Sequence, residues 1–394
     1  MMKKELKLIL AGILFLAAIL RIPLTSVGPL IPSLSDTTGL SLTNLSQLTS
    51  ISLLVFAILS TLVPKISRRL GLLPSILGSI SLVLVGILVR SFTGSIGLYI
   101  GTVIIAVGIC FGNVLLPTLA KTYFPNQLGK ITSSYTIVMN LMGAIGSSAA
   151  IPVLGLMHNV PSLALASVGF LALPALLVWF MIYLTGGANA TQTDAGTATQ
   201  MGAKVNIYRS KIAWSLATFM GLQSLIFYTY VSWLPKIIES KGYSLAFGGS
   251  LLGVLQLMIL PASFVVPVFA EKVKNQTGFV IFAGSAIFVG TLLLFTGNEF
   301  LMVVAVLILG IAVGSAFSLT LILFTIRTHS GQVAAELSGM SQTVGYTLAA
   351  VGPVFFGLLV GWTGSFITPL MLILVLAVLM VVIGYKAGKP GFID

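Results

Sequence analysis

Apolar residues run in long stretches along this chain, and short polar segments between them hold most of the charges. A helix that crosses a bilayer needs about 20 consecutive apolar residues. Such stretches lie at residues 8–31, 43–63, 73–91, 97–120, 132–156, 162–184, 212–235, 246–269, 277–296, 300–325, 337–361 and 367–385. Main-chain polar groups find no water in the bilayer, so each stretch must be helical. The pattern predicts an all-α membrane protein with twelve transmembrane helices.

The polar segment at residues 186–211 divides this pattern into two sets of six stretches. It is rich in glycine and small residues, which is typical of a flexible linker. Short motifs recur across it at a nearly constant offset: Ser41 matches Ser244, and Pro64 matches Pro267. We therefore expect an N-terminal six-helix bundle at 1–185 and a C-terminal bundle at 212–394, related as parallel repeats.

The net charge of +12 does not alter the prediction of a membrane protein. Charged residues make up only 7% of the chain, against about 25% in soluble domains, and hydrophobic residues make up 57%. The basic residues lie in short loops, so the positive-inside rule applies and nucleic acid is not an expected partner. The sequence predicts a multi-pass protein of the cytoplasmic (inner) cell membrane, with both termini cytoplasmic.

The orientation rests on a strong asymmetry of lysine and arginine. The outer side would hold only Arg90, Lys236 and Lys241. The cytoplasmic side would hold Lys3, Lys4, Lys7, Lys65, Arg68, Arg69, Lys121, Lys130, Lys204, Arg209, Lys211, Lys272, Lys274, Arg327, Lys386 and Lys389.

Arg21 is the charge that lies deepest in any predicted span. An arginine at the centre of a bilayer helix costs at least ~2.5 kcal/mol, and such residues face a bundle interior or an aqueous cavity. Spacing places Arg21, Thr25 and Gly28 on one stripe of the first span. The acidic residues all lie in loops or at span ends, so a negatively polarised substrate is the natural partner. The alternative is a structural arginine, bonded to carbonyls that the nearby prolines expose.

Further polar side chains fall near the predicted mid-depth of their spans. They are Asn113, Asn140, Gln223, Tyr228, Gln256, Gln342 and Tyr346. Amides and phenols can hydrogen-bond an anion or a nitro group without adding charge, so these are candidate substrate-binding residues. The alternative is helix-to-helix hydrogen bonding, worth about 0.6 kcal/mol per contact in membranes.

Charged residues at the cytoplasmic span ends suggest a gate. Arg68 or Arg69 is expected to pair with Glu336, and Glu271 with Lys130. Exposed ion pairs contribute about 0–1 kcal/mol, so they would bias conformational states without locking them. Glycines in the fifth and eleventh spans, including Gly146 and Gly352, are expected to allow close approach and sliding of those helices.

Four segments resemble a known family. They are residues 21–32 (RIPLTSVGPLIP), 112–117 (GNVLLP), 228–235 (YTYVSWLP) and 337–346 (LSGMSQTVGY). They are similar to motifs of the cyanate/nitroimidazole transporter family of the major facilitator superfamily. The resemblance covers both halves and implies movement of small planar or linear anions or nitroaromatics.

The expected function is secondary active transport of a small anion or small polarised compound, such as cyanate, nitrate or a nitroimidazole, by alternating access. The alternative is an efflux carrier of neutral or amphiphilic drugs in which Arg21 is structural. A receptor or scaffold has little support, because no sizeable soluble domain is present. The sequence holds no enzyme motif or metal-ligand cluster, and no cofactor is expected. Membrane lipid is an expected partner, the protein is expected to be a monomer, and protons are a possible coupling ion through His158 or Glu336.

Overall fold

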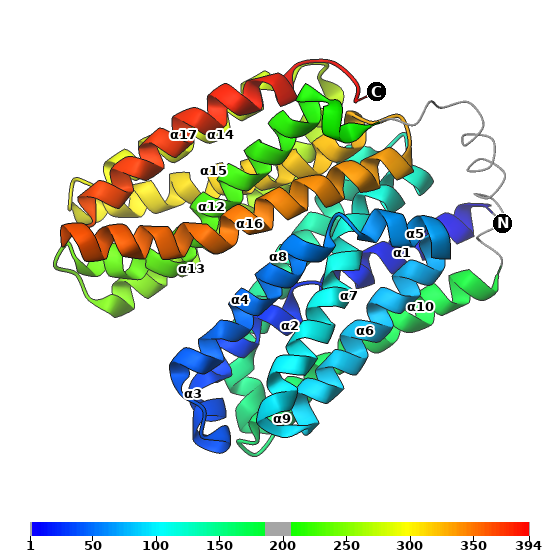
Figure 1. Cartoon of the computed structure of the whole chain (residues 1–394), viewed down its shortest axis with the longest axis horizontal. Coiled ribbons are helices and arrows are strands. Elements are labelled where there is room, and N and C mark those ends of the chain that lie inside the picture. Colours follow the sequence, from blue (N-terminus) through cyan, green and yellow to red (C-terminus); the bar gives the residue numbers. More distant parts are fainter. Residues whose placement is uncertain (1, 186–205, 394) are drawn as a thin grey trace. The chain divides into compact units, whose positions relative to one another are not determined.

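The computed structural model describes residues 2–185 and 206–393, and most of the predicted linker lies outside these ranges (Figure 1). The described residues form helices and no strands, as the apolar pattern predicts. The N-terminal half contains α1 (Met2–Ile19), α2 (Ile22–Thr25), α3 (Val27–Thr38), α4 (Leu42–Leu59), α5 (Val63–Leu70), α6 (Leu72–Phe92), α7 (Gly94–Tyr123), α8 (Leu128–Leu156), α9 (Pro161–Ser167), η1 (Val168–Leu171) and α10 (Ala172–Leu184). The C-terminal half contains η2 (Ile207–Arg209), α12 (Lys211–Glu239), α13 (Leu245–Lys272), α14 (Thr277–Leu293), α15 (Glu299–Ile326), α16 (Gly331–Thr363) and α17 (Ile367–Gly388).

Each predicted span has a helical counterpart. Within the described ranges, 10 helices are long and apolar enough to cross a membrane, and the bent pair α4–α5 raises this to 11. The remaining predicted span corresponds to α14, an apolar helix of 17 residues. The second span differs from the prediction of one continuous helix, because it bends by 62° between Leu59 and Val63. Pro64, which cannot donate a main-chain hydrogen bond, follows directly after this bend.

The recurring serines have the same local role in both halves. Ser41 precedes α4 and accepts a hydrogen bond from the Asn44 N–H, and Ser244 precedes α13 and accepts from the Phe247 N–H. A side-chain oxygen in this position satisfies one of the main-chain donors that a helix start leaves open. The repeat visible in the sequence therefore marks equivalent helix starts.

The chain divides into two compact units. Unit 1 comprises 1–127, 134–205 and 330–339, and unit 2 comprises 128–133, 206–329 and 340–394. They differ from the predicted halves in two segments, the first turns of α8 and of α16, each of which groups with the other half of the sequence. These two segments lie at the helix ends where the sequence predicts ion pairs.

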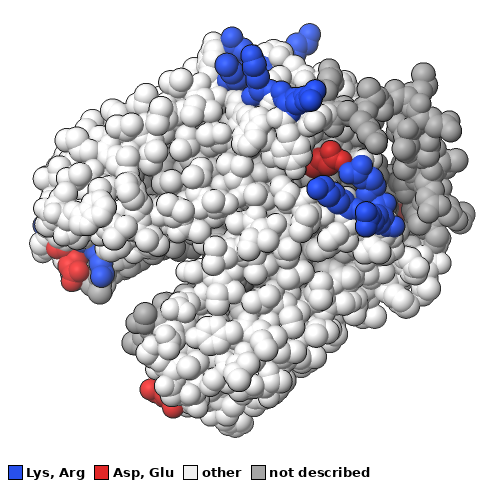
Figure 2. All heavy atoms as spheres, viewed as in Figure 1, with Lys and Arg blue, Asp and Glu red and all other residues white. Residues whose placement is uncertain are grey.

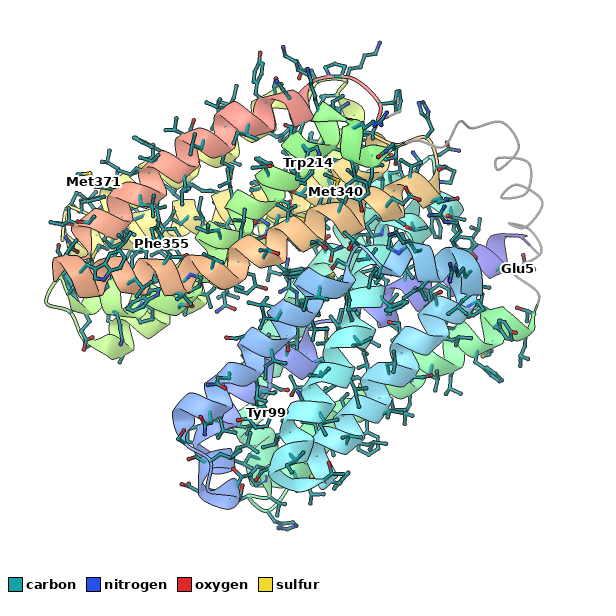
Figure 3. All side chains as sticks on the ribbon, in the orientation of Figure 1. Glu5, Tyr99, Trp214, Met340, Phe355 and Met371 are labelled. Carbon is teal, nitrogen blue, oxygen red and sulfur yellow. The ribbon has the colours of Figure 1, made fainter. Side chains whose placement is uncertain are left out.

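Glycines set the close packing inside each unit. In unit 1, a Cβ atom at Gly108 of α7 would lie 2.6 Å from the Ser79 carbonyl oxygen of α6. In unit 2, a Cβ atom at Gly310 of α15 would lie 2.5 Å from the Leu255 carbonyl oxygen of α13. Small residues at helix contacts are how membrane helices approach closely without a hydrophobic driving force between them. Large apolar side chains instead point outward, among them Phe355 and Met371 (Figure 3).

Candidate functional site

The first span is broken at Arg21. The helix α1 ends at Ile19 and α2 begins at Ile22, so Arg21 occupies the interruption with φ −116° and ψ −43°. The Arg21 carbonyl accepts hydrogen bonds from the N–H groups of Leu24 and Thr25, at 3.0 and 3.1 Å. A second interruption at Ser26 separates α2 from α3. The span is therefore not the continuous helix that the spacing predicts, and Gly28 lies beyond the second break, where it is exposed.

Arg21 and Thr25 share a face that packs against α8. A Cβ atom at Gly143 would meet the Arg21 Cβ at 3.5 Å, and one at Gly146 would meet the Thr25 Oγ1 at 2.5 Å. Asn140 lies one turn before Gly143 on the same face of α8 and is half-buried. Unit 1 thus brings three of the predicted site residues to one place, namely Arg21, Thr25 and Asn140.

Asn113 lies on a third helix, α7, which contacts the first span. Its neighbour Gly112 on α7 packs against Leu20, the residue that precedes Arg21, and an added Cβ would collide with a Leu20 methyl group. Asn113 itself is half-buried. The first-span break therefore packs against both α7 and α8.

A second buried arginine supports the same broken span, and sequence reasoning missed it. Arg90, in the last turn of α6, has a side chain that is 1% exposed. Its Nη1 donates a hydrogen bond of 2.7 Å to the carbonyl oxygen of Pro23 in α2, while its Nε and Nη2 have no hydrogen-bond partner. The hydropathy of the sequence places Arg90 near the outer end of its span. Hydropathy does not report which residues are buried by neighbouring helices, so it gave no sign that Arg90 is buried.

The predicted site residues of unit 2 differ in exposure. Gln223 on α12 and Gln342 on α16 are each 2% exposed, and Gln223 donates from Nε2 to the Ser224 hydroxyl at 2.8 Å. Tyr346 of α16 is also buried, and Tyr228 of α12 is half-buried with its ring edge against Phe227. Gln256 lies on an exposed face of α13.

The glycines of the fifth and eleventh spans contact other helices than expected. Gly143 and Gly146 of α8 face the first span, and Gly345 and Gly352 of α16 face Met220 and Leu225 of α12. Each of these glycine contacts lies within one unit, and a crossing of the fifth and eleventh spans stays a prediction. In each half, the fifth helix packs against the first helix.

Among the described residues, Arg68 forms an ion pair with Glu336. Its Nη2 lies 2.9 Å from Oε1 of Glu336, and both residues belong to unit 1. On the face shown in Figure 2, basic and acidic side chains lie together in only a few places. The Arg68 side chain is 50% exposed and that of Glu336 is 20% exposed. The interaction is therefore largely wetted and worth about 0–1 kcal/mol. Its role as a gate stays a prediction, as does any role of Arg69, which is exposed beside it.

The carboxylate of Glu271 holds the start of α8 through the main chain. Its Oε1 and Oε2 accept hydrogen bonds from the Leu128 and Gly129 N–H groups, at 2.8 and 2.7 Å. These donors belong to the open first turn of the helix, where a negative charge is favoured. Lys130, the partner expected from the sequence, is the next residue of this turn and is exposed.

One of the predicted proton carriers, His158, lies at the surface. His158 is an exposed residue of the turn after α8, with φ 54°. No group of three or more histidine, cysteine or acidic side chains suited to a metal ion is found in residues 2–185 and 206–393.

Comparisons with known proteins agree with this architecture. Residues 13–353 match the family described as the Major Facilitator Superfamily. The chain is 38% identical to the uncharacterized transporter YycB of Bacillus subtilis (strain 168), over 98% of this chain and 94% of that protein. It is 33% identical to the 2-nitroimidazole transporter of Escherichia coli (strain K12), over 97% and 95%.

A relative of lower identity and a solved structure also resemble this chain. The cyanate transport protein CynX of Escherichia coli (strain K12) is 24% identical over 87% of this chain and 88% of that protein. The structure of the proton:xylose symporter XylE superposes with a TM-score of 0.79 at 11% identity, covering 100% of this chain and 98% of XylE, which shows a shared fold. The chain therefore belongs to the major facilitator superfamily, in its cyanate/nitroimidazole transporter family, and is a membrane transporter rather than an enzyme.

Proposed function

We propose that this protein is a secondary transporter that moves a small anion, or a small compound with a polarised nitro or cyanate-like group, across the cytoplasmic membrane by alternating access. The observation that carries the proposal is Arg21 at the break of the first span. A guanidinium offers planar, paired donors that suit two-oxygen groups such as nitro or nitrate. The break places it beside a glycine face of α8, close to Thr25, and a substrate bound at Arg21 would lie near these residues.

The charge balance of the spans favours a negatively polarised substrate. The acidic residues that the structure describes lie near helix ends or, as with Glu5 and Glu299, in a first turn. A bulky organic cation would find no buried carboxylate to neutralise it, and charges within spans generally mark the substrate pathway. The relatives named for 2-nitroimidazole and cyanate transport fit this class of substrate.

Alternating access is supported by the fold and by the wetted contacts at the cytoplasmic helix ends. Rocking of two bundles around a fixed midplane site is the usual motion of this architecture. The Arg68–Glu336 pair is reversible at low energetic cost, so it suits a gate that closes in one state and opens in another. Protons are proposed as the coupling ion, carried by Glu336 or by a substrate that is itself a weak acid.

A ligand-induced thermal shift on the purified protein tests the binding role of Arg21. Cyanate, nitrate and 2-nitroimidazole would be titrated into the parent, Arg21→Gln and Lys65→Gln, the last removing an exposed charge outside the site. We expect at least one of these ligands to stabilise the parent and Lys65→Gln but not Arg21→Gln. Equal stabilisation of all three proteins would remove Arg21 from the site.

The runner-up function is efflux of neutral or amphiphilic drugs with Arg21 structural. Uptake into proteoliposomes separates the two, because an anion carrier transports the anionic member of a matched pair and ignores its neutral analogue. Transport of the neutral analogue by both the parent and Arg21→Gln would favour the efflux carrier.

A further inference from the structure

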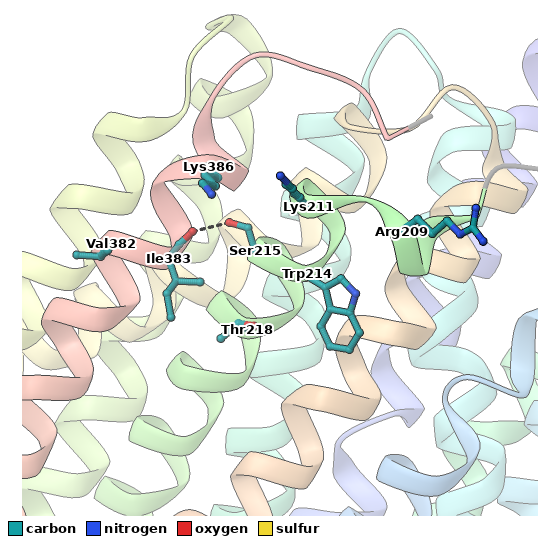
Figure 4. A pocket seen from close by; sticks show the side chains of 8 residues that line it. All are labelled: Arg209, Lys211, Trp214, Ser215, Thr218, Val382, Ile383 and Lys386. Atoms are coloured by element: carbon teal, nitrogen blue, oxygen red, sulfur yellow. Dashed lines mark hydrogen bonds between the residues drawn. The ribbon is translucent and has the colours of Figure 1, made fainter.

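A basic pocket lies at the end of unit 2 where α12 begins and α17 ends. It encloses about 430 Å³ and is lined on its polar side by Arg209, Lys211 and Lys386 (Figure 4). The two helices are tied together below these cations. The Ser215 hydroxyl of α12 donates to the Ile383 carbonyl at 2.5 Å and accepts from the Ala387 N–H at 3.1 Å. The floor of the pocket is therefore a fixed helix contact rather than a mobile loop.

The charge of this pocket is uncompensated by its own lining. Three cations line it, and no carboxylate does. All three side chains are exposed, so a ligand can reach them from solution. The start of α12 adds the positive end of a helix dipole on the same side. The pocket is suited to a ligand with at least one full negative charge.

The other side of the pocket is apolar and open. Val382 is 63% exposed and Trp214 is 47% exposed, and both line the same pocket as the lysines. The indole N–H of Trp214 donates to the Tyr208 carbonyl at 2.8 Å, which fixes the ring at the helix end. Tryptophan in this position is typical of the boundary between lipid tails and headgroups. A ligand held here therefore meets cations at one end and an exposed aliphatic surface along the other.

We propose that this pocket binds the phosphate headgroup of an anionic phospholipid, whose acyl chains lie along Val382 and the exposed face of α17. A free phosphate would use the cations alone, whereas a lipid also covers the apolar side, so the combined surface favours the lipid. Basic pockets between membrane helices are a common way to hold such headgroups. The site lies at the helix ends and is separate from the predicted mid-depth residues of the same unit, such as Gln223 and Tyr346.

Titration of the delipidated, detergent-purified full chain with lipid, followed by native mass spectrometry, tests this site. The probes are phosphatidylglycerol, phosphatidylcholine with the same acyl chains, and glycerol 3-phosphate. The test variant is Lys211→Gln with Lys386→Gln. The matched control is Lys272→Gln with Lys274→Gln, which removes two charges at the same end of the protein but outside the pocket.

We expect the parent and the control to bind phosphatidylglycerol, and the pocket variant to bind it roughly thirtyfold more weakly. Each single lysine variant should fall between the parent and the double variant. Equal weakening in the control would overturn the proposal, since it would mean general surface attraction. Equal affinity for phosphatidylcholine, or binding of glycerol 3-phosphate as tight as that of the lipid, would overturn it as well, the latter by indicating a site for soluble phosphate.

Discussion

The guanidinium of Arg90 in α6 donates to the carbonyl oxygen of Pro23 in α2 at a distance of 2.7 Å. Pro23 lies in a helix of only four residues, flanked by the breaks at Arg21 and Ser26. A short helical segment has little stability of its own, because nucleating a turn is costly. Arg90 therefore helps to fix the segment that carries Arg21 and Thr25.

Replacing Arg90 with methionine tests this positioning role. The substitution removes the bond to Pro23 but also removes two buried donors that have no partner, and each such donor costs about 1–3 kcal/mol. These terms offset each other, so we expect the free energy of unfolding to change by only about 1 kcal/mol. Ligand affinity should nevertheless fall several-fold, because α2 loses its anchor. Thermal unfolding and ligand titration on the same preparation measure both quantities.

Arg90→Ala serves as the comparison, because it also leaves a cavity. Large-to-small changes of this kind cost about 2–5 kcal/mol. If the methionine and alanine variants lose equal stability while both keep the parent's ligand affinity, Arg90 is a packing residue and does not position α2.

Substitution of Gly146 by alanine probes the contact between α8 and α2. The added Cβ would lie 2.5 Å from the Thr25 Oγ1 and 2.9 Å from the Ile22 Cγ1, so the first span must shift. Overpacking of this kind typically costs about 1–3 kcal/mol. We expect a lower unfolding temperature and weaker ligand binding. Gly155→Ala is the matched control on the same helix, since nothing lies within 4 Å of its Cβ, and it should leave both properties unchanged or slightly raise stability.

Exchange of the charges of Arg68 and Glu336 tests their role as a gate. The single variants Arg68→Glu and Glu336→Arg each place two like charges at the contact that now measures 2.9 Å. We expect each to change the transport rate several-fold in proteoliposomes, with little effect on thermal stability because the pair is wetted. The double variant should regain most of the parent's rate.

Arg69→Glu provides the reference for this exchange. It changes the charge of the same loop at the neighbouring position, outside the observed pair. A double variant that transports no better than the two single variants, or an Arg69→Glu defect that is rescued equally by Glu336→Arg, would argue against a specific gate.

Glu271 is expected to contribute more to stability than an ordinary surface acid. Its two oxygens satisfy two N–H groups of α8, so Glu271→Ala leaves both donors without this partner, at about 1–3 kcal/mol each if they stay dry. Glu271→Gln keeps one acceptor and should cost about half as much. Glu239→Gln, an exposed acid at the end of α12, is the control and should have no measurable effect on thermal unfolding. Equal melting temperatures for the alanine variant and the control would show that water replaces the carboxylate.

The sequence by itself determined the spans and the helix starts. Hydropathy over about 20 residues is a local property, and a bilayer leaves the backbone no choice but helix, so the twelve stretches correspond to helices almost one for one. Ser41 and Ser244 are visible as helix starts because capping depends on neighbours within three residues. Arg21 was visible as a candidate site residue because a charge in an apolar run is conspicuous in the sequence.

The tertiary structure decided where helices break and which distant groups meet. The proline-rich segment after Arg21 could break at several positions. The breaks at Arg21 and Ser26 occur where α6 and α8 contact this segment. Arg90 is buried by helices far from it in the sequence, and Glu271 finds its donors 143 and 142 residues away. Such pairings depend on which surfaces pack together, and a pattern of apolar and polar residues specifies only that a face is buried, without specifying its partner.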